Sequence, residues 1–189
     1  GEGKHMATAE SVVAHIQQWF RKIGAGVEYD WIRQCWHFLS RGKTCTLSSS
    51  HAQLEQAFLD QFIRTDLKQI GTGVLPDSVQ SMNKQTLANQ LILQVDEMTN
   101  IAEPLETRES GNNRLLKFKL TDGRQLVYGV EYKPCKEIPY VLPKDRQFVK
   151  IAVRDVTVRR GMLLLQPGNV RLLGRGLHAD CDSEANSED

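Results

Sequence analysis

The chain has 189 residues, of which 40% are hydrophobic, so it can build a real core in one domain or in two small ones. Its formal net charge of +1 at pH 7 excludes a strongly basic nucleic-acid binder and a polyanion mimic as descriptions of the whole molecule. The charge is uneven, because residues 87–175 carry 15 Lys and Arg against 10 Asp and Glu. The five acids from Asp180 onward stand without bases, so we expect residues 178–189 to be an acidic disordered tail; mimicry of a nucleic acid by this tail is the alternative.

Cysteine spacing and hydropathy indicate the cellular compartment. Cys35, Cys45, Cys135 and Cys181 form no Cys-x-x-Cys pair, and no His stands at zinc-finger spacing, so we expect no metal site. The sequence shows neither a signal peptide nor an apolar run long enough to span a bilayer, which favours a reduced compartment, cytosol or nucleus, and no membrane partner. Residues 1–6 are interpreted as the remnant of an expression tag and are left out of the fold prediction.

The first part of the chain has the periodicity of helices. A helix around residues 11–20 places its apolar side chains on one stripe and ends at Gly24. That stripe consists of Val12, Ile16, Trp19 and Phe20. A second helix is expected at about residues 29–39, with Asp30 as its N-cap.

A third helix follows, for which the hydroxyls of residues 48–50 offer an N-cap. It breaks near Arg64, and Thr65 or Asp66 caps a short further turn. We therefore expect residues 7–76 to form a small bundle of three or four helices packed against the rest of the chain. All three Trp lie in this part, and large amphipathic rings of this kind tend to be mostly buried.

The second part alternates apolar and polar residues with a period of two, as strands do. Such runs occupy residues 91–95, 115–120, 126–132, 149–153 and 162–165, and residues 170–172 can extend the last. Gly123 and Gly161 mark two reversals, where φ can become positive. Five strands of this length suit an oligonucleotide/oligosaccharide-binding (OB) barrel over residues 77–177. The predicted fold class is α+β, with a small N-terminal helical bundle packed on a five-stranded OB-fold β-barrel.

The strand pattern also sorts the barrel aromatics. Phe118, Tyr128 and Tyr132 each share a strand face with Leu or Val, so all three rings are expected in the core. The opposite faces then offer no ring on which a base could stack, which argues against specific binding of single strands. Four cations are the candidates for weak phosphate contact: Lys117, Lys119, Arg159 and Arg160. The two arginines also fit a solvated hairpin tip.

The sequence contains no recognisable set of catalytic side chains. The five His residues are scattered, and none pairs with a Ser or Cys in a nucleophile motif. Residues 71–73 are too few for a phosphate loop and lack its Lys. We therefore expect no catalytic residues, no cofactor, no metal ligands and no enzyme, because a small barrel without such groups usually exists to bind something.

The connection between the first two barrel strands, residues 97–113, is much longer than a hairpin needs. It is polar toward its end and carries Ile101, Pro104 and Leu105 near its start. Two interpretations stay open. The apolar residues fold back on the barrel, or the loop is a projecting arm that binds a partner.

Several motifs occur in an order and spacing that resemble a known family. They are FIRTDL at 62–67, LTDG at 120–123, GVEY at 129–132, GMLLL at 161–165 and NVRLLG at 169–174. Together they resemble the N-terminal region of the RecQ-mediated genome instability protein 1 family, over residues 12–177. The resemblance implies a nuclear, non-catalytic scaffold that binds topoisomerase III and a Bloom-type RecQ helicase. It further implies stimulation of double Holliday junction dissolution, with DNA contacted weakly or through these partners.

In that family the loop between the first two barrel strands lies at the gate of the topoisomerase. The contact residues implied by this position are Asn100, Ile101, Glu103, Pro104 and Leu105. The chain departs from the family in its shorter loop and in Leu173-Gly174-Arg175, where relatives tend to have a second Gly. The N-terminal region of tudor-domain-containing protein 3, which binds topoisomerase III-beta, is the alternative family. A single-stranded nucleic-acid-binding OB protein is the alternative function.

Overall fold

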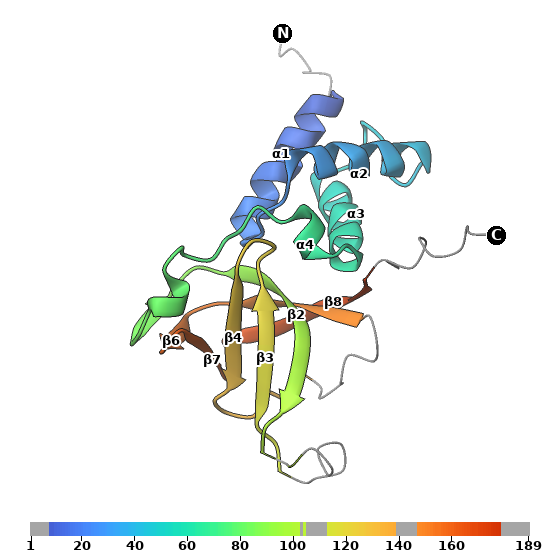
Figure 1. The fold of residues 1–189 in the computed structure, drawn as a ribbon. Coiled ribbons are helices and arrows are strands. Elements are labelled where there is room, and N and C mark those ends of the chain that lie inside the picture. The colour runs from blue at the N-terminus through green and yellow to red at the C-terminus, as the bar shows by residue number, and fades with distance from the viewer. Residues whose placement is uncertain (1–7, 103, 105–112, 139–146, 179–189) are drawn as a thin grey trace, which may run out of the picture.

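The computed structural model describes residues 8–102, 104, 113–138 and 147–178, and it places a helical bundle on one end of a curled β-sheet (Figure 1). The expected tag and residues 179–189 of the expected tail lie outside the described residues. His178, which we expected to begin the tail, is instead packed against Asp66 and Phe148. The bundle consists of α1 (Ala9–Ile23), α2 (Tyr29–Arg41), α3 (His51–Arg64) and the short α4 (Leu67–Ile70). The predicted α+β fold class is confirmed.

Local sequence signals set the starts of the helices. Thr8 and Ser50 each form a capping box, in which the hydroxyl accepts a main-chain N–H of the first turn of α1 and of α3. The carboxylate of Asp66 caps α4 by accepting the main-chain N–H of Lys68. The expected N-cap of α2 is wrong, because Glu28 occupies that position. Asp30 instead lies in the first turn, where its negative charge suits the helix dipole.

The bundle core combines aliphatic side chains with a few large aromatic rings and continues into the sheet. Phe20 and Phe62 are fully buried, with ring centroids 5.1 Å apart. Trp36 is buried, and the other two Trp pack partly buried at the edge of this core. Ile92 and Ala152 of the sheet belong to the same cluster, so the bundle rests directly on the barrel.

Within the described residues, eight strands form one sheet in the order β1-β6-β7-β4-β3-β2-β5-β8. They are β1 (Gln85–Leu87), β2 (Leu91–Asn100), β3 (Leu116–Thr121), β4 (Leu126–Glu131), β5 (Gln147–Val153), β6 (Val156–Arg159), β7 (Met162–Leu165) and β8 (Val170–Leu177), and a 3-10 turn (Val79–Ser81) precedes β1. β4 and β7 pair in parallel, whereas the other neighbours are antiparallel.

The eight strands contain the five that the sequence predicts. β5 and β6 follow each other along the chain, as do β7 and β8, and β6 pairs with β7 while β5 pairs with β8. These four strands are therefore one long bent hairpin. One arm of this hairpin pairs with β2 and the other with β4, which curls the sheet around a shared hydrophobic core.

Two of the reversals occur where glycines predict them. Gly123 and Gly161 have φ angles of 93° and 73°, which side-chain-bearing residues rarely adopt. At the first reversal, the buried carboxylate of Asp122 accepts hydrogen bonds from the main-chain N–H groups of Val74 and Leu75, both at 2.8 Å. The turn between β3 and β4 thereby fixes the segment that leads from the bundle into the barrel.

The register between β3 and β4 decides which side chains reach the barrel core. Phe118 lies opposite Gly129, and both are buried. Lys119 lies opposite Tyr128, and these two side chains share the outer face. Phe118 is buried as predicted, but the prediction that Tyr128 and Tyr132 face the core is wrong, since they are 41% and 61% exposed.

The hydrophobic pattern of β4 predicts the wrong orientation for this strand. The face that points into the barrel core is the less hydrophobic of its two faces. Inward-facing are Val127, Gly129 and Glu131; outward-facing are Leu126, Tyr128 and Val130. A Cβ at Gly129 would lie 3.1 Å from the side chain of Leu120, so a larger residue there would require Leu120 to shift. Glu131 is buried through a pairing with Arg114. Neighbouring residues of a strand point to opposite faces, so an error of one residue exchanges the two faces. Choosing the face with more apolar residues as the core face therefore gave the wrong orientation for β4.

A buried lysine connects the bundle to the barrel. Lys150 of β5 has no exposed surface, and its Nζ donates to the main-chain oxygens of Thr65 and of Ile63, the latter at 3.4 Å. The last carbonyl groups of a helix lack partners within the helix and favour a cation, so this ammonium group suits the end of α3. Burial lowers the pKa of Lys150 to about 7, although Asp66 and Asp96 raise it in part.

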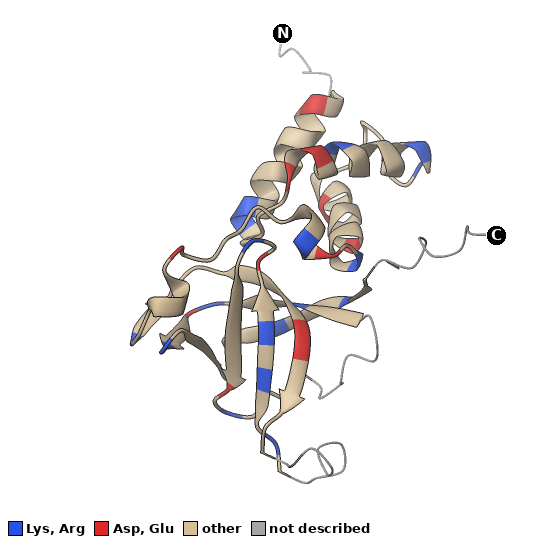
Figure 2. Ribbon diagram, in the orientation of Figure 1, with Lys and Arg blue, Asp and Glu red and all other residues tan. Residues whose placement is uncertain are grey.

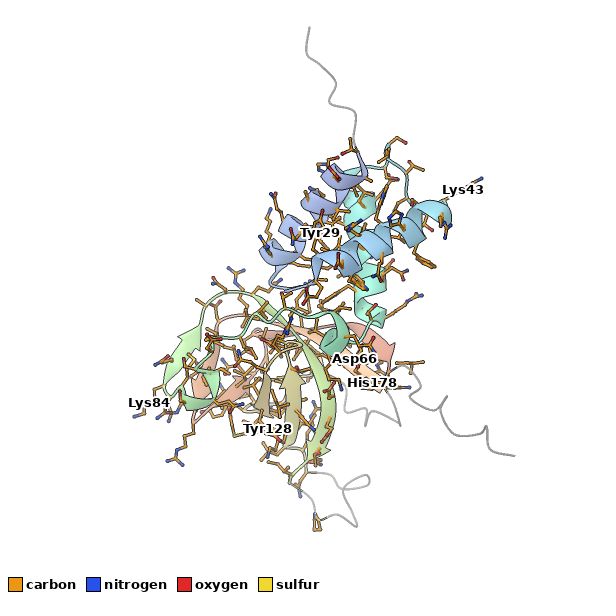
Figure 3. The ribbon with its side chains drawn as sticks, turned by 45° about the horizontal axis from the view of Figure 1, so that its top comes forward. Tyr29, Lys43, Asp66, Lys84, Tyr128 and His178 are labelled. Atoms are coloured by element: carbon orange, nitrogen blue, oxygen red, sulfur yellow. The ribbon has the colours of Figure 1, made fainter. Side chains whose placement is uncertain are left out.

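Gln94 of β2 and His178 complete this bundle–barrel joint, defined as Lys150, Gln94, Asp66 and His178. The Gln94 amide donates to Asp66 and accepts from the Leu67 N–H, both at 2.8 Å. His178 Nδ1 lies 2.7 Å from Asp66 Oδ2, and Figure 3 shows the two residues side by side. Burial raises the pKa of Asp66, but hydrogen bonds from Gln94, the Lys68 amide and His178 bring it below its ordinary value.

Candidate functional site

The connection from β2 to β3 leaves the barrel through a closed loop neck, formed by Asn100, Ile101, Asn113 and Leu115. The Asn100 amide donates to the main-chain oxygen of Asn113 (2.7 Å) and accepts from the N–H groups of Leu115 (3.0 Å) and Ala102 (3.2 Å). The N–H of Ile101 donates to the main-chain oxygen of Leu115 (2.8 Å). Asn100 is buried, so its side chain holds the two ends of the loop together.

Arg114, next to the neck, is fixed by the buried carboxylate of Glu131. Its Nε and Nη2 donate to the two carboxylate oxygens at 2.9 and 2.5 Å, a bidentate geometry. Hydrogen bonding to Glu131 raises the pKa of Arg114 above its usual value. Nη2 also donates to the main-chain oxygen of Ile138 (2.8 Å), and Glu131 accepts the Cys135 N–H (2.7 Å). One cluster therefore fixes both the end of the first loop and the start of the connection after β4.

The structure separates the five predicted loop contacts. Ile101 is 45% exposed and Pro104 is exposed. Asn100 is instead engaged inside the neck. Glu103 and Leu105 lie outside the described residues. The role of these residues as partner contacts stays a prediction.

A barrel-face groove of about 320 Å³ begins beside the neck on the outer side of β2, β3 and β4. Its lining consists of Glu97, Thr99, Ile101, Lys117, Phe118, Lys119 and Tyr128. Lys117 Nζ lies 4.7 Å from the ring centroid of Tyr128, a cation–π contact. Lys119 Nζ lies 2.7 Å from Glu97 Oε1, and this hydrogen bond raises the pKa of Lys119. Figure 2 shows the two basic positions of β3 beside an acidic stretch of β2.

The two predicted arginine contacts lie elsewhere. Arg159 and Arg160 occupy the exposed tip between β6 and β7. This tip rests on the segment before β1, because the N–H of Arg160 donates to the Asn83 side chain (3.1 Å) and that of Gly161 to the Met82 oxygen (2.9 Å). The four candidates for phosphate contact thus form two separate pairs, of which only the lysine pair lies in the groove.

Sequence reasoning missed Arg114, Glu131 and the exposure of Tyr128. One available signal was Gly129, since a glycine inside a strand indicates that another group approaches closely. A second was the acid at position 131 in an otherwise apolar strand, which needs a cationic partner if it faces the core. Neither signal identifies the partner without the register of the sheet.

Among the described residues, no group of three or more His, Cys, Asp or Glu side chains could hold a metal ion. Cys35, Cys45 and Cys135 are free and buried. Burial raises the pKa of Cys35 to about 12 and that of Cys135 to about 11, which keeps both as weakly nucleophilic thiols. No helix in the described part of the chain has the length and hydrophobicity needed to cross a bilayer.

Comparison with known proteins gives a consistent set of relatives. A family model described as "RMI1, N-terminal OB-fold domain" matches residues 105–184. RecQ-mediated genome instability protein 1 of Oryza sativa subsp. japonica is 33% identical over 177 residues, covering 90% of this chain and 21% of the relative. The protein of the same name from Arabidopsis thaliana is 37% identical over 167 residues, covering 84% and 25%.

A second kind of relative shares part of the chain. Tudor domain-containing protein 3 of Danio rerio is 28% identical over 146 residues, covering 76% of this chain and 20% of the relative. The chain therefore spans about a fifth to a quarter of the length of these three curated relatives.

Proposed function

This chain is related to the N-terminal region of the RecQ-mediated genome instability protein 1 family, and we propose that it is a non-catalytic scaffold for a topoisomerase III–RecQ helicase complex. In this role it binds topoisomerase III and a Bloom-type helicase in the nucleus and stimulates double Holliday junction dissolution. The names of the relatives support the RecQ link and a function in genome stability. The topoisomerase partner is what the family resemblance implies, with loop 97–113 assigned to this contact by its position between the first two barrel strands.

The loop neck is the observation that carries this proposal. A loop that binds a partner gains affinity when its ends are held in place before binding, because less chain entropy is lost on association. Here Asn100 joins the two ends, and Arg114 anchors the second end to a buried carboxylate. A loop with no task beyond connecting β2 and β3 would need neither its length nor such a neck.

The first test replaces residues 103–112 with a short Gly-Ser linker and leaves the neck intact. The variant should fold, since loop length changes the closure free energy by only about 0.6 kcal/mol per doubling. We expect a strong reduction in the stimulation of topoisomerase III, measured as decatenation of single-stranded catenanes. Full stimulation by a folded variant overturns the role of the loop. Failure of the unaltered chain to co-elute with topoisomerase III overturns the scaffold role itself.

A second variant distinguishes the effect of the orientation of the loop from the effect of its composition. Asn100→Ala keeps every loop residue but removes the three side-chain hydrogen bonds of the neck. We expect stimulation between that of the wild type and that of the loop deletion. Asn83→Ala is the matched control, because it removes an exposed Asn that accepts one main-chain hydrogen bond at the far hairpin tip. Equal activity of the two variants contradicts a positioning role for Asn100.

The relationship to tudor domain-containing protein 3 supports a second candidate, in which the partner is topoisomerase III-beta. Pull-down with the alpha and beta isoforms in parallel distinguishes the two. Preference for the alpha isoform supports the first proposal, and preference for the beta isoform supports the second.

A further inference from the structure

The side of α2 that faces away from the bundle core carries exposed side chains at intervals of three and four residues. This spacing places them on one side of the helix, the outer face of α2, defined as Arg33, Gln34, His37, Phe38 and Arg41. The Phe38 side chain is the large apolar group of this face and is 65% exposed. We infer that the outer face of α2 binds an acidic amphipathic helix of a second protein partner.

Two hollows give this face its shape. A ridge runs along it from Arg33 through His37 to Arg41, at intervals of four residues. On one side of the ridge, a hollow of about 320 Å³ lies between α1 and α2, and its lining includes the buried side chains of Val13 and Trp36. On the other side, a hollow of about 530 Å³ follows the exposed ring of the outer face. The face therefore offers apolar contacts on both sides of a ridge that carries arginines.

The charges of the face favour an acidic partner. Arg41 and Lys43, at the end of α2, form no ion pair with another described residue. Figure 2 shows basic positions along α2, and Figure 3 shows Lys43 projecting at its far end. Arg33 lies 3.7 Å from Asp30 in a solvent-exposed pair, which contributes little and can be exchanged for a partner carboxylate. Glu10, in the lining of the first hollow, is the acid that opposes such a partner.

A helix fits this face because the side-chain ridges of one helix pack into the grooves beside the ridges of another. Apolar residues four or seven positions apart share one side of a helix. One such residue can enter the hollow over Val13 and Trp36 while the other packs on Phe38. Acidic residues beside these two then meet the arginines of the ridge.

Other occupants fit the face less well. A nucleic acid would meet the cations at the end of α2 but would leave the apolar lining of the first hollow unused. A second copy of this chain would bring the same arginines together, because a two-fold contact repeats one surface on both sides. The acidic end of this chain, residues 180–189, contains no Leu, Ile, Val, Met or aromatic residue that could fill either hollow.

The inference goes beyond the proposed scaffold role and can fail separately from it. α2 lies at the bundle end of the molecule, and the loop neck lies at the opposite end of the barrel (Figure 1). The deletion of residues 103–112 should thus lose stimulation of the topoisomerase and keep helix binding, whereas Phe38→Ser should do the reverse. Loss of stimulation by Phe38→Ser would mean that the topoisomerase itself contacts this face, which overturns the inference of a second partner.

The experiment starts from a display library of random peptides of about 16 residues, long enough for about four helical turns. Peptides are selected on the 189-residue chain and counter-selected on the double variant Phe38→Ser/Arg41→Gln. We expect the enriched sequences to be rich in Glu and Asp and to carry large apolar residues four or seven positions apart. Fluorescence anisotropy then measures the affinity of one labelled, enriched peptide for single variants.

Phe38→Ser should weaken binding of this peptide about tenfold or more, since it removes the apolar anchor. Tyr132→Ser is the matched control, because Tyr132 is a similarly exposed ring on the barrel, 61% against 65%, and it should leave the affinity unchanged. Arg41→Gln should weaken binding about threefold, and less at high salt. Glu10→Gln should tighten it about twofold, a gain that damage to the fold would not produce.

Circular dichroism confirms that each variant is folded. The inference is overturned if no peptide is enriched over the counter-selected variant, or if the enriched peptides lack acidic residues and helical spacing. It is also overturned if Phe38→Ser behaves like Tyr132→Ser, or if oligothymidylate competes as well as the unlabelled peptide.

Discussion

Each end of the barrel holds a cation against buried polar atoms. The two cations differ in whether their partners carry a full negative charge or only partial charges. At the bundle end, the partners of Lys150 are the oxygens of Ile63, Thr65 and Gln94, which carry only partial charges, and burial lowers the lysine pKa to about 7. At the loop end, Arg114 meets the full charge of Glu131, and its pKa is raised. Both clusters join segments that are far apart in sequence.

The comparison shows which contact depends on pH. Arg114 keeps its proton at any pH at which the protein is folded, so the positive charge that anchors the second end of the loop does not change with pH. Lys150 can lose its proton near neutral pH, so the stability gained at the bundle–barrel joint changes with pH. The loop end of the barrel, which is proposed to orient the partner-binding loop, is thus the end whose cation keeps its charge at all relevant pH values.

Arg114→Gln should have the largest effect on stability. It leaves Glu131 buried and without its counter-charge, a loss that costs about 3 kcal/mol in the free energy of unfolding. Urea denaturation followed by tryptophan fluorescence measures this loss. Arg33→Gln is the control, since Arg33 forms a solvent-exposed pair with Asp30 at 3.7 Å, and it should change stability little. Equal effects of the two variants would show that the neck is not an anchored structure.

Much of this architecture could be predicted from local sequence signals. Hydroxyls at the start of α3, Asp66 before α4 and the glycines of the two turns act on their immediate neighbours, so the sequence alone locates them. The positions of five barrel strands followed from the hydrophobic pattern, whereas their order in the sheet was not predicted. The neck could not be predicted, because the partners of Asn100 and Arg114 come from distant parts of the chain.

Lys150 shows why alternation alone does not determine burial. The pattern around Val149 and Ile151 separates the two faces of β5, with Lys150 and Ala152 opposite the barrel core. In the structure this second face is covered by the helical bundle, so a lysine that alternation places toward solvent is fully buried. Alternation separates the faces of a strand, but the tertiary packing decides what lies against each face.

The next prediction concerns the pH dependence of the joint. Above about pH 7 the folded protein releases the Lys150 proton, whereas the unfolded chain keeps it until about its usual 10.5. Because the unfolded state binds more protons in this window, the free energy of unfolding should rise with pH by up to about 1.4 kcal/mol per pH unit. Lys150→Met should lack this contribution.

Urea denaturation of both proteins between about pH 6 and pH 9 tests this difference. The gap between wild type and Lys150→Met should be constant below about pH 6 and should shift in favour of the wild type as the pH rises. A gap that stays constant throughout the range would mean that the buried lysine keeps its proton. The charge of the cation would then be independent of pH at both ends of the barrel.

His178→Ala should produce the smallest change, because it acts at the solvent-facing edge of the joint. It removes a hydrogen bond to Asp66 and the edge contact of the imidazole with Phe148, but Gln94 and the Lys68 amide still donate to Asp66. We expect a loss of about 1 kcal/mol at neutral pH, against no loss for His37→Ala on the exposed side of α2. A loss as large as that of Arg114→Gln would reverse the comparison. The bundle end would then contribute as much to stability as the loop end, and the cluster that positions the loop would not be the more strongly stabilised of the two.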